Sequence, residues 1–129
     1  MVGRVPAGEA FSARQRDEVE RAIRFAAQES GLPVAVYVGP LEGDGDPRRA
    51  AEQLHARLDD PAESVLVAVD PGSRQLEIVT GAEVRHRLDD RASGLASISM
   101  TTAFAAGDLT GGIVTGVRML AEHARARSR

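Results

Sequence analysis

Cysteine and tryptophan are absent from this 129-residue sequence, and aromatic residues make up only 3% of it. Without cysteine, the protein has neither disulfide bonds nor thiolate metal ligands. The scarcity of aromatic side chains and the net charge of −3 remove both the stacking platform and the basic surface that nucleic-acid-binding proteins use. We therefore expect no nucleic-acid partner.

Long hydrophobic runs are also missing. The longest apolar stretch, residues 103–121, is interrupted by Asp108 and Arg118, so it does not have the composition of a membrane-spanning helix. The N-terminal sequence MVGRVPAGEAF has one arginine and no apolar core, unlike a signal peptide. These features predict a cytoplasmic protein without a transmembrane segment, and they leave peripheral association with a membrane surface open.

The middle of the chain contains a strongly apolar segment around which the fold is expected to form. Residues 64–69, SVLVAV, are an almost unbroken run rich in β-branched side chains, which is typical of a strand covered on both faces. The sequence DPGS at 70–73 predicts a turn. Apolar and polar residues then alternate over 75–80, as in a more exposed strand. The segment is therefore predicted to be a β-hairpin.

Helical segments are predicted before and after this hairpin. The first begins at Ser12, which has capping-box spacing to Gln15, and it ends at Gly31. The second begins after the capping residue Asp46 and runs to about Leu58. Three more are predicted at 82–88, 91–106 and 109–124. One of the two aspartates at 89–90 is expected to cap the helix at 91–106, and the aspartate at 108 is expected to cap the helix at 109–124.

A strand at 34–38, a helix and the strand at 64–69 follow one another in this order. The order predicts a right-handed crossover between parallel neighbours, with strand 75–80 antiparallel at an edge. Strand 34–38 is mostly apolar and is therefore predicted to be internal too. The predicted fold is α/β: a small mixed sheet with helices on both faces. This single domain spans residues 11–124, between a flexible leader at 1–10 and a basic, frayed tail at 125–129.

One loop invites a test for calcium binding. Glu42, Asp44 and Asp46 alternate like the first ligands of a calcium-binding loop. However, Pro47 and Gln53 occupy the positions where that loop needs its glycine and its bidentate glutamate. We therefore interpret Asp46 as a helix cap.

Aspartates near the hairpin form the second candidate site. In α/β sheets, ligands bind beyond the carboxyl ends of the parallel strands, which here are Gly39-Pro40 and Asp70. The sequence leaves open whether His86, Asp89 and Asp90 fold toward the same edge. Asp70 and Asp90 are candidate catalytic residues, and Asp70, Asp89 and Asp90 are candidate ligands of Mg²⁺ or Ca²⁺. Each also has an ordinary structural role in a turn or a cap, and otherwise no cofactor is expected.

The chain resembles the TPM domain family in three stretches. These are the helix start at Phe11-Ser12, the hairpin SVLVAVDPGSRQLEIVTG with the LDD after it, and the segment FAAGDLTGGIVTGVRMLAEH at 104–123. The last is close to the family's Phe-x-x-Gly-Asp-(Tyr/Leu)-x-x-Gly-(Ile/Leu)-x-x-Gly helix. The resemblance covers residues 9–124 and is strongest to a short, stand-alone actinobacterial branch of unknown function, and it implies a three-layer α/β/α arrangement.

Two departures from that family stand out. Typical members have a signal sequence and a membrane anchor, and this chain shows neither. Many members end the hairpin in Gly-Tyr-Gly-Leu-Glu, where residues 80–83 here are Thr-Gly-Ala-Glu.

The resemblance implies two functions. TPM-like domains are implicated in the assembly and maintenance of membrane complexes, which favours a non-catalytic interaction module with a protein partner. A plant relative is associated with acid phosphatase activity and a divalent metal. Metal-assisted phosphoester hydrolysis by the aspartates is therefore the alternative. No hydrolase motif such as Gly-x-Ser-x-Gly accompanies the aspartates, so the first function is favoured.

Overall fold

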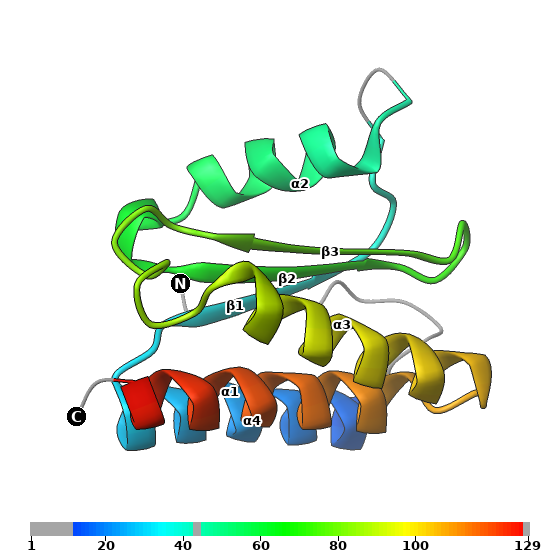
Figure 1. Ribbon diagram of the computed structural model, residues 1–129. Helices are drawn as coiled ribbons and strands as arrows, with labels where there is room; N and C mark the ends of the chain where they lie inside the picture. Colours follow the sequence, from blue (N-terminus) through cyan, green and yellow to red (C-terminus); the bar gives the residue numbers. More distant parts are fainter. Residues whose placement is uncertain (1–11, 43–44, 128–129) are drawn as a thin grey trace.

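The computed structural model describes residues 12–42 and 45–127 and shows a sheet between two layers of helices (Figure 1). The elements in chain order are α1 (Ala13–Ser30), β1 (Val34–Val38), α2 (Pro47–Ala56), the 3₁₀ helix η1 (Pro61–Glu63), β2 (Val65–Asp70), β3 (Gln75–Thr80), α3 (Asp90–Ala105) and α4 (Leu109–Arg127). Helix α2 covers one face of the sheet, and α1, α3 and α4 cover the other. The predicted leader at 1–10 lies outside the described residues.

The sheet has the order β1-β2-β3, with β2 in the centre. Strand β1 is parallel to β2, with Val34 opposite Val65, and β3 is antiparallel to β2. The mixed sheet and the hairpin are therefore confirmed. The prediction that β1 is internal is wrong for the described part of the chain, where it forms an edge. Its valines are buried because helices cover both faces of the strand, and an apolar sequence does not reveal whether a strand has neighbours on both sides.

Strand β2 divides the core into two clusters. Its residues Val65, Val67 and Val69 face α1, α3 and α4, while Leu66 and Ala68 face α2. All five side chains are 2% exposed or less, as expected for a strand between two helix layers.

The predicted helix caps are present. Ser12 and Gln15 exchange both capping-box hydrogen bonds, and Gly31 ends α1 with a φ of 66°. The Asp46 carboxylate accepts a hydrogen bond from the Arg48 backbone N–H at 3.0 Å, so it caps α2, as predicted. Asp89 is the aspartate that caps α3.

The segment at 82–88 does not form the predicted helix but a series of turns. The Glu83 N–H donates to the Ala62 carbonyl at 2.9 Å, a bond that ties the segment to η1. Val84 and Leu88 are both 1% exposed and fix the segment to the core. A distant partner therefore overrides the local helical pattern.

Helices α3 and α4 approach each other closely at two glycines of α4. A Cβ on Gly112 would lie 2.9 Å from the Ala103 Cβ, and one on Gly116 would lie 2.5 Å from Met100 Cγ. The small residue Ala103 of α3 allows this close approach, while Leu95 of the same helix is exposed to solvent.

Helix α4 continues into the predicted tail. It ends at Arg127, and Arg125 forms an ion pair with Glu29 of α1 at 3.7 Å. Residues 128–129 lie outside the described part of the chain. Neither α4 nor any other helix among the described residues combines the length and apolar composition needed to cross a membrane.

Candidate functional site: a crevice at the carboxyl end of β2

A crevice of about 380 Å³ opens where the β2–β3 turn approaches the junction of α3 and α4. It is the end of the sheet at which ligands are expected in α/β folds. Its lining includes Asp70, Arg74, Gln75 and Leu76 from the hairpin, and Thr101, Phe104, Ala105 and Leu109 from α3 and α4.

The walls of the crevice are apolar because the main core is incompletely covered at this end. Leu76, Phe104 and Leu109 pack against the core, yet each is only partly buried. Asp70 and Arg74 are the charged residues that line the crevice. An apolar cavity with a few polar groups at its margin is the usual form of a binding site.

Asp70 holds the margin of the crevice in place. Its carboxylate accepts hydrogen bonds from the Leu41 N–H at 3.0 Å and from the Ser73 N–H at 3.3 Å. Partial burial alone would raise the pKa of Asp70, but hydrogen bonds from Leu41, Ser73 and Gly72 outweigh it and hold the pKa below its usual 3.8. The group is therefore ionised and already bonded to backbone donors, which makes it unsuited to act as a general acid.

Asp89 and Asp90 lie at the other end of the molecule. They stand at the N-terminus of α3, whereas Thr101 and Phe104, near its C-terminus, line the crevice with Asp70. At 1.5 Å per residue, the two ends of this helix are roughly 20 Å apart. The structure therefore does not bring Asp70 together with the other two aspartates.

Asp89 has its own surroundings. A hydrogen bond from the Ala92 N–H lowers its pKa; desolvation opposes this shift, and the nearby charges of His123, Arg127 and Arg91 reinforce it. Both the bond and the charges are what a capping carboxylate at a helix N-terminus experiences.

The histidines also lie away from the crevice. His55 Nε2 is 3.0 Å from the Ser64 carbonyl at the start of β2, and His123 lies near Asp89. His86 belongs to the turns that follow β3. Within residues 12–42 and 45–127, no three histidine or carboxylate side chains form a group that could hold a metal ion. In the loop that was compared with a calcium-binding loop, Asp44 lies outside the described residues. A metal at Asp70, Asp89 or Asp90 therefore stays a prediction.

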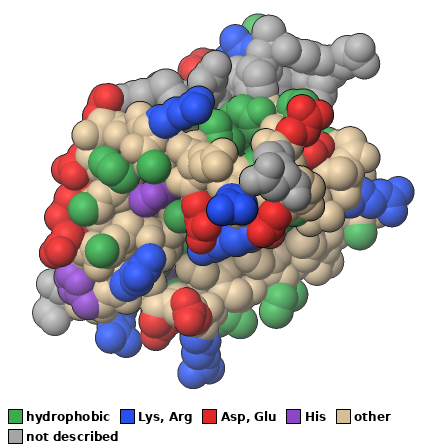
Figure 2. Space-filling view, turned by 90° about the horizontal axis from the view of Figure 1, so that it is seen from above, with side chains coloured by type: hydrophobic (Ala, Val, Ile, Leu, Met, Phe, Trp, Pro, Cys, Tyr) green, Lys and Arg blue, Asp and Glu red, His purple; other side chains and the backbone are tan. Residues whose placement is uncertain are grey.

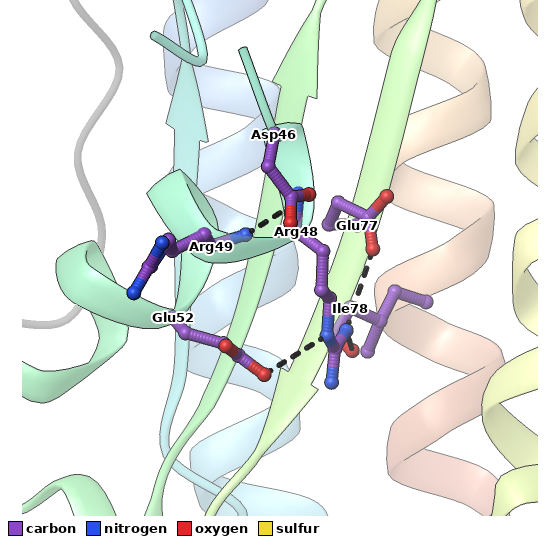
Figure 3. A network of polar contacts seen from close by, with 6 residues as sticks. All are labelled: Asp46, Arg48, Arg49, Glu52, Glu77 and Ile78. Atoms are coloured by element: carbon purple, nitrogen blue, oxygen red, sulfur yellow. Dashed lines mark hydrogen bonds and ion pairs between the residues drawn. The ribbon is translucent and has the colours of Figure 1, made fainter. Parts of the chain in front are cut away.

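The molecular surface on the α2 side of the sheet carries charged side chains (Figure 2). Seen from the α2 side, acidic and basic side chains lie next to one another (Figure 2). Among them, Arg48 contacts the Glu52 carboxylate at 3.3 Å and the Glu77 carboxylate at 3.4 Å, and it donates to the Ile78 carbonyl at 2.7 Å (Figure 3). This network links α2 to the outer edge of β3.

Two features were missed by reasoning from the sequence. Arg74 has a φ of 57°, a left-handed conformation that is uncommon for residues other than glycine. Leu95 and Ile98 of α3 are 48% and 65% exposed. The exposure of Leu95 and Ile98 could have been found from the sequence, because residues 92–107 contain no charged side chain that would form a solvent-facing surface.

The fold and the crevice together define a small α/β domain with a largely apolar crevice at one end of its sheet. The chain belongs to the family described as "Domain of unknown function (DUF5130)", whose model matches residues 1–121. Two relatives from Mycobacterium tuberculosis, the uncharacterized proteins Rv2468c and MT2543, are each 28% identical over 102 residues. The match covers 79% of this chain and 60% of each relative, so the chain corresponds to only part of these longer proteins.

Solved structures share the fold at low sequence identity. The BA42 protein of Bizionia argentinensis has a TM-score of 0.81 at 18% identity, covering 94% of this chain and 85% of that one. The N-terminal domain of a protein from P. gingivalis has a TM-score of 0.75 at 20% identity over 95% and 80% of the two chains. The N-terminal domain of cg2496 from Corynebacterium glutamicum has a TM-score of 0.73 at 19% identity over 99% and 80%. These similarities concern the fold alone.

Proposed function

We propose that this domain is a TPM-type protein-interaction module that binds a protein partner through the crevice and the exposed face of α3. One observation carries the proposal: Leu95 and Ile98 are exposed on a helix that has no charged side chain between residues 92 and 107. At helical spacing Ile98 and Ala105 lie on one side of α3, so the exposed face of the helix leads toward the crevice. Such a surface is typical of a contact site.

The alternative function, metal-dependent phosphoester hydrolysis, has weaker support. A phosphatase of the expected kind needs several carboxylates around one cation. Asp70 lies at the carboxyl end of β2, while Asp89 and Asp90 lie roughly 20 Å away at the far end of α3. The interaction module, acting in the cytoplasm, is the function we propose.

Photo-crosslinking tests the proposed surface. A benzoylphenylalanine at position 98 is expected to give a discrete protein adduct in native cell extract. The same group at position 56, which is exposed on α2, is expected to give none. Leu95→Glu in the position-98 variant should abolish the adduct. Equal labelling from both positions, or no adduct from position 98, would contradict the proposal.

A further inference from the structure

The outer edge of β3 has backbone groups that are not used by the sheet. The Gly81 N–H donates to the Ser64 carbonyl, and these two residues are opposite each other in the antiparallel register. Hydrogen-bonded pairs alternate in such a ladder, so every second residue from Gly81 backward bonds to β2. The N–H and C=O groups of Leu76, Ile78 and Thr80 therefore point away from β2. Figure 1 shows β3 as the front edge of the sheet, with no described element in front of it.

Arg48 covers the middle of this edge and leaves its crevice end open. The bond from Arg48 to the Ile78 carbonyl confirms that Ile78 points outward (Figure 3). Charged side chains that cover an edge in this way prevent unwanted strand pairing. Leu76, two residues nearer the crevice, has no such cover among the described residues.

A strand that pairs with Leu76 would also reach the crevice. In an antiparallel pair, the side chains of directly opposite residues lie on the same face of the sheet. Leu76 faces α3, where it lines the crevice together with Phe104 and Ala105. A residue opposite Leu76 would therefore place its side chain against these apolar walls. The ligand that fits is an extended chain with an apolar residue at this position.

Arg74 indicates which end of such a chain binds. The left-handed backbone conformation is unfavourable for residues other than glycine, yet Arg74 adopts it at the margin of the crevice. Within residues 12–42 and 45–127, no carboxylate forms an ion pair with this exposed guanidinium. An antiparallel strand runs from Thr80 toward Gln75, so its C-terminal end arrives at Arg74. A terminal carboxylate has the charge and geometry that a guanidinium binds.

We propose that the domain binds the free C-terminus of a partner protein as an added β-strand, with an apolar residue of the partner in the crevice and its terminal carboxylate on Arg74. Addition of an extended peptide to a sheet edge is an established mode of recognition. This inference rests on the proposed function and specifies the partner's chemistry. The contacts it adds lie at the edge of β3 and in the crevice, whereas the photo-crosslinking experiment tests the outer face of α3.

Two peptide libraries test the inference. The first displays random heptapeptides with a free C-terminus, and the second carries the same heptapeptides followed by a fixed linker, so that no carboxylate is available. The domain is expected to enrich sequences from the first library only, with an apolar residue at one fixed position among the last three. Enrichment that is equal in both libraries, or absent from both, would overturn the inference.

Variants then assign the contacts of an enriched peptide. Arg74→Gln is expected to weaken its binding by about tenfold or more, the usual effect of losing a hydrogen bond between charged groups. The same variant should not change the weak binding of the C-terminally amidated peptide. Ala105→Leu should block binding by filling the crevice. Ala106→Leu, an exposed neighbour outside the crevice lining, is the matched control. Equal losses for the free and amidated peptides, or for Ala105→Leu and Ala106→Leu, would contradict the assignment.

Nuclear magnetic resonance locates the peptide on the fold. The largest chemical-shift changes are expected at the Leu76 amide and in residues 101–109. Changes centred on α2, or domain dimerisation without peptide contacts at β3, would refute strand addition. If the libraries fail while position 98 still gives its adduct, this inference falls and the interaction module stands. If both fail, the proposed function falls as well.

Discussion

Gly81 lies where the end of β3 meets η1, and there is no room for a methyl group beside it. A Cβ at this position would overlap the carbonyl oxygens of Pro61 and Ala62, and it would lie 2.5 Å from the carbonyl carbon of Ala62. These are backbone atoms, so no side-chain rotation relieves the overlap. The same contact is held by two hydrogen bonds of 2.9 Å, from the Gly81 N–H to the Ser64 carbonyl and from the Glu83 N–H to the Ala62 carbonyl.

The expected cost of Gly81→Ala follows from these contacts. Overpacking costs about 1–3 kcal/mol, and each hydrogen bond that is lost when the chains separate costs about 0.5–1.5 kcal/mol. With two such bonds, the free energy of unfolding should therefore fall by about 2–6 kcal/mol. For a domain of 129 residues, 1 kcal/mol corresponds to roughly 3.7 °C, so the melting temperature should fall by roughly 7–22 °C.

Gly94→Ala is the matched control. Gly94 is an exposed residue of α3, and a Cβ there would have no atom within 4 Å. Because alanine favours the helix over glycine, this variant should be more stable by about 1 kcal/mol. Urea denaturation followed by circular dichroism, together with calorimetry, measures both variants. A Gly81→Ala domain that melts within about 2 °C of the wild type would refute the packing argument.

Four further predictions concern the core, the metal and pH. Val67→Asp should abolish folding, since an unpaired buried carboxylate costs several kcal/mol; a native circular dichroism spectrum would contradict this. Gly116→Leu should lower stability by about 1–3 kcal/mol through its contact with Met100, and an unchanged melting temperature would disprove it. Millimolar Mg²⁺, Mn²⁺ or Ca²⁺ should neither raise the melting temperature nor produce hydrolysis of a chromogenic phosphate ester. A shift lost in Asp70→Asn or Asp90→Asn, with metal-dependent hydrolysis, would establish the phosphatase instead. Because the folded pKa of Asp70 is lowered, its ionised form stabilises the domain above the unfolded pKa of about 3.8. The stability difference between wild type and Asp70→Asn should therefore shrink as pH falls through that lowered pKa, and a difference that does not change with pH would contradict this.

The elements themselves could be predicted because they depend on neighbouring residues. The capping box at Ser12, the cap at Asp46 and the apolar run of β2 are all patterns within a few positions of the chain. The order of the strands then limited the topology to a mixed sheet covered by helices. The sequence also placed Asp70 at the carboxyl end of a parallel strand, which is where the crevice lies.

Features that join distant residues were decided only by the tertiary structure. The turns at 82–88 are held by distant parts of the chain, because Glu83 bonds to Ala62 and both Val84 and Leu88 are buried in the core. The separation of Asp70 from Asp89 depends on the direction in which α3 crosses the sheet, which no local pattern contains. The crevice joins Leu76 to Phe104 across 28 positions of the chain, and its apolar walls are core residues left partly uncovered where the layers end. Each of these outcomes depends on contacts between segments that are far apart in the chain, so it could not be derived from any single segment.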